Sequence, residues 1–540
     1  MPEILTTEYK TDACRRFAQD VQNNNYYVMV SSIEEFVPDD TQISKNAFLE
    51  KVIFGKKIKP EDTHFMIKYY PWQRDQIFVQ YDDNEPLDEQ KFYCVVGPND
   101  NDTGDYRIYK CLFNNYGAGV QSPPAYNDSS DDQIYRTADG YIWKFMYVVS
   151  ALEEDAYSHI GYIPLVGDFN QDPAASPNGG GGISDILVEN NEQNFGYVEE
   201  QGRVTAADVV NRVVEIVPST TFNPRQNYYN GQSIYFNNPD GSTYLYKITG
   251  YVYDDTSNKA DITLDQDPVT QGGGTSVVKE AATFSIFPTV KIEGDGTGAV
   301  AIPNIVENTI DTVIVLDPGT GYNSALATIV DPENDFNPDA TNSTDVRAQV
   351  RAILTPDGDH GYNLIDEFKC RHYSLYGYIT GDDNNQIGAT NTYGCVGIVK
   401  NPEFSTVSPP IVFDNRIGIV SDNIDRITLN DSVVQLDSDN EIQFSGIIHE
   451  VDADNETFYI AEYMGPYVNG TDGEGDTSLN LNLPIRNSTG QTIEINTPEA
   501  DNVTFSPYVQ RTGKIYFMEN FKPLPRTEGS REEFKFVLEF

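Results

Sequence analysis

The sequence predicts a mainly β fold, α+β at the N-terminus, in a multidomain chain of β-sandwich-like domains with a few short helices. Three observations support this fold class. Tyrosine and phenylalanine are abundant, with 35 and 27 copies in 540 residues, and strands favour such aromatic residues together with Val, Ile and Thr. Turn-forming Gly, Pro, Asn and Asp interrupt the apolar runs every few residues. A chain of this length exceeds what one hydrophobic core usually supports, so we expect several domains.

An amphipathic helix is predicted near the N-terminus. Three apolar residues recur at four-residue spacing behind a Thr cap: Ala13, Phe17 and Val21. This spacing predicts a helix over Thr7–Val21 that ends at the asparagines 23–25. The run YYVMVS predicts a strand over Tyr26–Ser31, and SKNAFLEKVIF predicts a second short helix over Ser44–Phe54, stopped by Gly55.

Strands dominate the rest of the first 170 residues. Runs rich in β-branched and aromatic residues predict strands at His64–Tyr70, Phe92–Val96, Tyr106–Phe113 and Tyr141–Val149. The last of these runs is apolar on both faces, so we expect it to be a central strand.

Two composition changes predict domain boundaries. The Pro, Gly and Ser tract Pro173–Gly182 suits no regular element and separates 1–170 from 171–349. Strands are expected in this second part at Arg212–Val217, Thr243–Tyr253 and Asp311–Leu316. A further boundary near Asn401–Glu403 opens a second β insert, 404–510, with strands at Arg426–Asn430 and Thr457–Tyr463. The remaining segments, 350–403 and 511–540, are expected to complete one domain, with the C-terminal run of alternating aromatics as a paired strand.

A faint internal repeat lies inside the first insert. Ile183–Tyr197 and Ile310–Tyr322 each contain a strand, a polar turn and a Gly-Tyr pair. We interpret the two segments as one small β unit used twice.

Charge and cysteine content restrict the partners. The formal net charge of −47 opposes a phosphate backbone, so nucleic acid is not an expected partner, whereas basic protein surfaces are. Five scattered cysteines without a CxxC pair predict small buried thiols rather than disulfides or zinc ligands: Cys14, Cys94, Cys111, Cys370 and Cys395. The sequence lacks both a signal-peptide pattern and 18 consecutive apolar residues, so we expect synthesis in a cytoplasm and no membrane partner.

The sequence contains no complete motif for catalysis or for binding a cofactor or metal. Gly294–Ala299 (GDGTGA) fits a dinucleotide-binding pattern, but Pro303 and β-branched residues follow it, so we expect a hairpin turn instead. The acidic runs Pro98–Tyr106 and Asp472–Asp476 miss the EF-hand register and predict solvated turns, with an adventitious ion as the alternative. The histidines His64, His159, His360, His372 and His449 stand apart from one another and from the cysteines. The sequence therefore predicts a protein that is not an enzyme, with no cofactor and no metal.

Several segments together carry a resemblance. The main ones, in chain order, are Arg107–Asn115, Ser122–Pro124, Ala138–Val149 and Gly513–Asn520. Supporting ones are Pro71-Trp72, Gly161–Val166 and Gly397–Pro402. In sequence and order they resemble the gene-eight baseplate wedge protein family of T-even-type contractile-tailed bacteriophages. The resemblance covers residues 1 to about 170, about 350–403 and 511–540. It departs at an added residue near Phe517, at Lys522 in place of a proline, and at 171–349 and 404–510, which have no counterpart.

The resemblance implies a structural role. It predicts a virion protein that forms a homodimer, links neighbouring baseplate wedge proteins, and takes part in the rearrangement that triggers sheath contraction. The matching residues are expected to be architectural: Trp72, Tyr109, Cys111, Leu112, Asp139, Gly140, Tyr141, Trp143, Pro402, Tyr516, Met518, Glu519 and Asn520. Large aromatic residues on one strand face bring buried area rather than acid–base chemistry. The alternative is a host-surface or glycan-binding adhesin that uses aromatic residues of 404–510.

Overall fold

The computed structural model is mainly β, as predicted, with a helix near the N-terminus followed by strands. Apart from single positions at 192, 195, 209, 221, 505 and 528, the structure describes residues 5–32, 45–87, 90–98, 104–125, 134–159, 161–167, 181–268, 276–330, 347–380, 391–464, 479–496 and 503–540. Most of the tract Pro173–Gly182 and of the acidic run Pro98–Tyr106, and all of Asp472–Asp476, lie outside these residues.

The chain divides into two compact units that alternate along the sequence. The first contains 1–68, 151–166 and 370–540, and the second contains 69–150 and 167–369. Residues 69–150 thus belong with the first predicted insert rather than with the residues that precede them.

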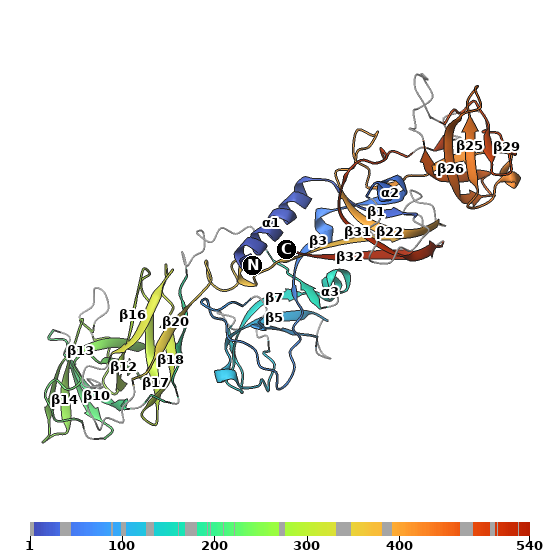
Figure 1. Ribbon diagram of the computed structural model, residues 1–540. Helices are drawn as coiled ribbons and strands as arrows, with labels where there is room; N and C mark the ends of the chain where they lie inside the picture. The colour runs from blue at the N-terminus through green and yellow to red at the C-terminus, as the bar shows by residue number, and fades with distance from the viewer. Residues whose placement is uncertain are drawn as a thin grey trace. The chain divides into compact units, whose positions relative to one another are not determined.

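Two sheets that pack together form the centre of the first unit (Figure 1). The first has the order β23-β2-β1-β22-β31, with bounds Val412–Asp414, Val52–Ile58, Tyr26–Ser31, Asn391–Lys400 and Lys514–Arg526. The second has the order β32-β21-β3-β8, with bounds Arg531–Glu539, His372–Thr380, Thr63–Lys68 and Tyr162–Pro164. Phe517 of β31 packs on Phe536 of β32, with ring centroids 5.3 Å apart, and so joins the two sheets. The C-terminal strand is therefore paired, along β21.

Helix α1 (Thr7–Asn23) begins at the expected residue. Its N-cap is Thr6, whose hydroxyl accepts a hydrogen bond from Tyr9 N–H at 3.3 Å. Phe17 and Val21 are buried, as the spacing predicts, and Cys14 and Ala18 lie on the same buried face, whereas Ala13 is only partly buried.

The second predicted helix is wrong over half of its length. Helix α2 covers only Lys45–Glu50, and strand β2 begins at Val52. Val52, Ile53 and Phe54 are β-branched or aromatic, and pairing with β1 overrides the helical spacing. Gly55 therefore does not stop a helix. It lies inside β2, where an added Cβ would come within 2.5 Å of the Phe413 ring.

Residues of the second predicted insert form a separate sheet in the same unit. Its order is β29-β28-β25-β26-β27-β24-β30, with bounds Thr492–Ile493, Ile485–Asn487, Ser432–Leu436, Ile442–Asp452, Thr457–Met464, Ile417–Val420 and Val503–Thr504. The strand predicted at Arg426–Asn430 is wrong. A 3₁₀ turn over Ile424–Arg426 is followed by a loop in which Asn430 takes a left-handed φ of 64°, and pairing starts only at Ser432.

The second unit begins with the sheet β4-β5-β7-β6, with bounds Tyr93–Val96, Tyr106–Phe113, Ile142–Val149 and Ile134–Arg136. Strand β7 lies between β5 and β6, so the doubly apolar run is an internal strand, as predicted. Helix α3 (Ala151–Tyr157), in the first unit, follows it in the chain.

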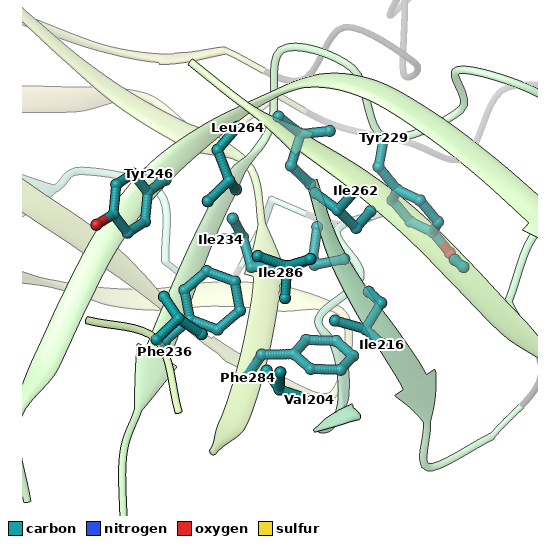
Figure 2. Close-up of a cluster of buried hydrophobic side chains, with 14 of the residues drawn as sticks. Val204, Ile216, Tyr229, Ile234, Phe236, Tyr246, Ile262, Leu264, Phe284 and Ile286 are labelled. Carbon is teal, nitrogen blue, oxygen red and sulfur yellow. The ribbon is translucent and has the colours of Figure 1, made fainter. Parts of the chain in front are cut away.

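A closed barrel follows in the order β10-β11-β14-β13-β12-β15, with bounds Glu200–Asp208, Val213–Pro218, Lys259–Leu264, Thr243–Asp254, Ser233–Asn237 and Thr283–Phe287. Buried positions alternate along β11 and β14, as expected when one strand face points inward. Figure 2 shows the resulting interior, in which Ile216, Ile262 and Ile286 meet between the strands.

The rest of the second unit contains three strand pairs and a short helix. The pairs are β16 (Thr289–Gly294) with β19 (Ala325–Val330), β17 (Val300–Val306) with β18 (Thr309–Asp317), and β9 (Ile183–Val188) with β20 (Val350–Leu354). The helix is α4 (Leu364–Glu367). The Gly-Tyr pairs of the internal repeat end in one common core, where Tyr197 and Tyr322 are both buried.

The glycine motif Gly294–Ala299 leads into strand β17 and not into a helix. It is not a hairpin, however, because β16 pairs with β19 and β17 pairs with β18. The prediction of a simple hairpin turn is therefore wrong, although the expected lack of a helix after the motif is correct.

Candidate functional site

Three charged or titratable side chains from distant parts of the second unit meet in its interior. Lys110 comes from β5, Glu367 from the end of α4, and His360 from the turn before α4. Residues 108–112 of β5 are all buried, so both faces of the strand are covered there and the side chain of Lys110 lies in the interior. Here the side chains of Lys110 and Glu367 are both 0% exposed.

Short contacts connect the three groups. Lys110 Nζ lies 2.6 Å from Glu367 Oε1 and 2.9 Å from His360 Nδ1. The Lys110 ammonium also lies 3.3 Å from the centroid of the Tyr81 ring, which adds a cation–π contact. The second carboxylate oxygen, Glu367 Oε2, accepts a hydrogen bond from Gly361 N–H at 2.7 Å. Both charges are therefore compensated inside the protein.

The environment fixes the charge of each group. Burial lowers the pKa of Lys110 to about 8, although the Glu367 carboxylate opposes that shift. Burial alone would raise the pKa of Glu367, but the charge of the adjacent Lys110 ammonium outweighs it and holds the pKa at about 2. Burial and the nearby Lys110 charge lower the pKa of His360. At neutral pH the cluster therefore contains an ammonium, a carboxylate and a neutral imidazole.

Ser184 extends the cluster toward a cavity. It is the extra residue of a β-bulge in β9, between Ile183, which is opposite Leu354, and Asp185, which is opposite Ile353. A bulge redirects side chains that would otherwise alternate between the faces of a strand. Ser184 Oγ lies 2.8 Å from His360 Nε2.

The series Ser184, His360 and Glu367 has the order of a hydrolase triad, in which Nε2 accepts the serine proton. His360 Nδ1 lies 2.9 Å from Lys110 Nζ and 3.2 Å from Glu367 Oε1, so the tautomer of the ring decides the role of Nε2. An ammonium group only donates hydrogen bonds, so in the tautomer in which Nδ1 accepts from Lys110 the ring proton sits on Nε2 and is donated to Ser184 Oγ. In the other tautomer Nδ1–H donates to Glu367 and Nε2 accepts from Ser184. In both tautomers the buried ion pair between Lys110 and Glu367 holds α4 against β5 as a structural clamp.

Arg351 forms a second charged contact in the same unit, and this contact also joins segments that are far apart in sequence. Arg351 of β20 donates from Nη1 to Asp82 Oδ1 at 2.9 Å and from Nη2 to Asp82 Oδ2 at 2.5 Å, and its Nε reaches Glu189 at 3.1 Å. Such bidentate pairs hold a fixed geometry. Arg351 therefore ties Asp82, from residues 69–150, to β20 and to Glu189, the residue that follows β9.

The first unit contains an analogous contact between its central sheet and the 417–504 sheet. Glu462 of β27 accepts a hydrogen bond from Ser32 and pairs with Lys51 at 2.9 Å. His449 Nε2 lies 3.5 Å from the same carboxylate. Burial would raise the pKa of Glu462, but the bonds from His449, Ser32 and Lys51 hold it at about 2.

Most residues matched to the wedge family in 69–150 lie in one aromatic core. Tyr109, Cys111, Tyr141 and Trp143 are buried there, and the Tyr141 and Trp143 rings stack at 5.4 Å. Trp72 packs against this core while partly buried, and Leu112 is buried beside it.

Asp139 and Gly140 form the turn before β7, as the sequence indicates. Gly140 has a φ of 86°, and its N–H donates to Thr137 O at 3.0 Å. Asp139 Oδ2 accepts hydrogen bonds from Gln121 N–H at 2.6 Å and Ser122 N–H at 3.1 Å. Burial alone would raise the pKa of Asp139, but these two hydrogen bonds and a third from Thr137 outweigh burial and lower the pKa. The carboxylate therefore organises the turn.

The remaining matched residues lie in the first unit. Along β31, Met518, Glu519 and Asn520 pair with residues 395–397 of β22, and Tyr516 packs on Tyr26 at 5.4 Å while 40% exposed. Pro402 is buried just after β22. These residues are thus separate from the aromatic core of 69–150.

Sequence reasoning missed Lys110, His360 and Glu367 as a group. One signal was available, because a lysine in an apolar strand is almost never fully buried without a counter-charge. No sequence signal identified Glu367 as its partner, since Lys110 and Glu367 are 257 positions apart.

The described residues contain no group of three or more His, Cys, Asp or Glu side chains that could hold a metal ion. Each cysteine is a buried free thiol. Within the described ranges, no helix is long and apolar enough to cross a membrane. Comparisons with models of known protein families and with curated proteins found no match.

Proposed function

We propose that the chain is a structural baseplate wedge subunit of a contractile phage tail, which links neighbouring wedge proteins and takes part in the rearrangement that triggers sheath contraction. One observation carries the proposal. Segments that resemble the wedge family share sheets although they are far apart in sequence: β1 pairs with β22, which pairs with β31, and β3 pairs with β21, which pairs with β32. Residues 200–287 and 417–504, which have no family counterpart, form a barrel and a sheet of their own.

The charged clamps suit such a role. A subunit that transmits force needs firm contacts between its inserted β segments and the segments that resemble the wedge family. The ion pairs of Arg351 provide such a contact in the second unit, and those of Glu462 provide one in the first. The net charge of −47 favours partners with basic surfaces. By this proposal the protein is made in the host bacterial cytoplasm, is not an enzyme, and forms a homodimer in the virion.

Mass spectrometry of virions purified through two density gradients tests the location. We expect the chain at a constant ratio to the other tail proteins in intact particles, and its absence from them contradicts the proposal. Equilibrium sedimentation of the full chain at physiological salt tests the dimer. A monomer at every concentration up to about 50 µM, where even weak specific dimers with a Kd of about 10 µM would form, contradicts it.

A cavity favours a second candidate function, a host-surface or glycan-binding component of the tail. It has a volume of about 520 Å³ and lies between the central sheet and the 417–504 sheet of the first unit, lined by Ser32, Asn430, His449 and Glu450 among others. That volume is within the usual range for small-ligand sites. Against a sugar-stacking role, Tyr463 and Tyr508 are buried, and Tyr459 is covered by the Arg416 guanidinium at 4.7 Å.

A glycan array probed with the full chain separates the two candidates. Saturable binding that is lost in Asn430→Asp, at the exposed edge of the cavity, supports the adhesin. Binding that is unaffected by this variant, or no binding, leaves the structural role as the better account.

A further inference from the structure

A second cavity, in the other unit, contains a carboxylate that no clamp uses. It has a volume of about 220 Å³ and lies between the β5–β7–β6 sheet and the strands β9 and β18. Its walls are mainly aliphatic and include Leu112, Ile142, Val313 and Val315. This volume is below the roughly 300–1,000 Å³ of pockets that enclose drug-sized ligands, so it fits a single side chain or a small molecule.

The polar groups of this cavity come from the β9 bulge. Ser184 and Asp185 are adjacent in sequence, and both line the cavity. Asp185 Oδ1 accepts a hydrogen bond from Ile186 N–H at 2.8 Å, and Oδ2 accepts one from Gln80 Nε2 at 3.1 Å. A carboxylate can accept about four hydrogen bonds, so each oxygen retains capacity for a donor that enters from the cavity.

Asp185, which is partly buried, has a weaker counter-charge than the carboxylates described above. Glu367 and Glu462 each pair with a lysine, and Asp82 pairs with Arg351. Burial raises the pKa of Asp185 to about 6, and the charge of Arg136, which also lines the cavity, opposes only part of that effect. A cation that enters the cavity would therefore gain a poorly compensated negative charge in surroundings where charges interact more strongly than in water.

The mouth of the cavity is apolar and accessible. Ile134 and Ile314, which line it, are each 42% exposed. The formal charge of −47 raises the concentration of cations around the chain. Aliphatic walls, a partly buried carboxylate and an acidic exterior together match one ligand chemistry.

We propose that this cavity is a binding site for a primary ammonium group on an aliphatic stem, with the ammonium on Asp185, the Ser184 hydroxyl beside it, and the stem against the walls formed by Leu112, Ile142 and Val313. Two sources have this chemistry, a free alkyl diamine and a lysine side chain of a partner protein. The cavity binds such a group whether or not the chain belongs to a tail baseplate.

The test is a titration of the full chain, by calorimetry and ligand-observed NMR at 0.15 M NaCl, with 1,5-diaminopentane and with Nα-acetyl-lysine methylamide. Pentan-1-ol and the Nε-acetylated lysine derivative are the neutral comparators. We expect saturable binding with a Kd below about 10 mM for at least one amine and at least tenfold weaker binding of its comparator. The tighter of the two amines identifies the source.

Variants locate the site. Asp185→Asn keeps the shape of the side chain and its hydrogen-bond acceptor, and we expect it to weaken amine binding at least tenfold. Asp261→Asn, at an exposed barrel position, makes the same change in net charge and should have no effect. Ile314→Trp should also weaken binding, by closing the mouth without touching the carboxylate. Failure of both amines to bind, equal binding of the amines and their comparators, or unchanged binding in Asp185→Asn overturns the proposal.

Discussion

Lys110 and Glu367 form a 2.6 Å ion pair with neither side chain exposed, although 257 positions separate them in the sequence. Replacing a buried ion pair by apolar residues can be neutral, whereas removing one partner leaves an uncompensated charge that costs about 3–5 kcal/mol. The pair therefore makes the packing of α4 on β5 highly sensitive to single substitutions.

Glu367→Gln should destabilise the second unit by about 3–5 kcal/mol, because the Lys110 ammonium stays buried without its counter-charge. Urea unfolding followed by tryptophan fluorescence measures this change, since both tryptophans, Trp72 and Trp143, lie in that unit. The control is Glu215→Gln, which removes the partner of Lys259 in a pair whose side chains are 33% and 40% exposed. It should cost less than about 1 kcal/mol. Equal effects of the two substitutions would contradict the role assigned to the buried pair.

The same carboxylate predicts how stability depends on pH. The pKa of Glu367 is about 2 in the folded chain, below its ordinary value of 4.5. A carboxyl group with a depressed pKa stabilises the fold fully above its unfolded pKa and loses that contribution as pH falls through the folded pKa. The wild-type chain should therefore lose this part of its stability between about pH 4.5 and pH 2. In Glu367→Gln the loss over that range should be shallower, and the two free energies of unfolding should converge toward pH 2. Parallel curves in acid titrations at fixed urea would show that Glu367 is not the group responsible.

The two tautomers of His360 make opposite predictions for Ser184. We expect the tautomer in which Nδ1 accepts from Lys110, its closer partner at 2.9 Å, so that Nε2 carries the ring proton and Ser184 has no base to activate it. Incubation with a fluorophosphonate at pH 7, followed by peptide mass spectrometry, should leave Ser184 unmodified. A serine hydrolase treated in parallel provides the positive control. Stoichiometric labelling of Ser184 would mean that Nε2 accepts the serine proton and that the expected tautomer is wrong.

Gly397 in β22 should not tolerate a side chain. An added Cβ would lie 2.7 Å from the Phe48 ring and 3.0 Å from the Phe517 carbonyl oxygen. Gly397→Ala should therefore destabilise the first unit by about 1–3 kcal/mol through overpacking. Gly97→Ala is a matched control, since its Cβ would meet only the Tyr106 ring at 3.6 Å, an ordinary contact. Proteolytic susceptibility of the 1–68 and 370–540 segments should rise in the first variant only, and a stable Gly397→Ala chain would refute the close packing.

Elements with strong local signals could be predicted from the sequence. Helix α1 begins where the Thr cap and apolar spacing place it, and β1 and β5 have the predicted bounds. The predictions failed where tertiary pairing overrides local preference. Val52–Phe54 continue a helical spacing but pair with β1, and the run at Arg426–Asn430 has strand-like residues but ends in a left-handed Asn430.

The candidate site was less predictable than the fold. The sequence identifies Lys110 as an anomaly within an apolar strand, yet its partner lies beyond any local pattern. The Ser184 bulge depends on the register between β9 and β20, two strands separated by more than a hundred residues. The positions of the matched aromatic residues were easier to predict, because the alternation that places Tyr141 and Trp143 on one strand face is enough to indicate a core.

The interleaving of the two units has a consequence for synthesis on the ribosome. Strand β1 is complete at residue 31 but pairs with β22, which begins at residue 391, about 360 residues later. At bacterial translation rates of about 5–20 residues per second, β1 waits for on the order of tens of seconds before that partner exists. The barrel strands, all within 200–287, can pair as soon as they emerge. The order of emergence therefore favours early closure of the barrel. Strand β1 can pair early with β2 on one side, but its other edge stays open until β22 emerges and is exposed to aggregation in the interval.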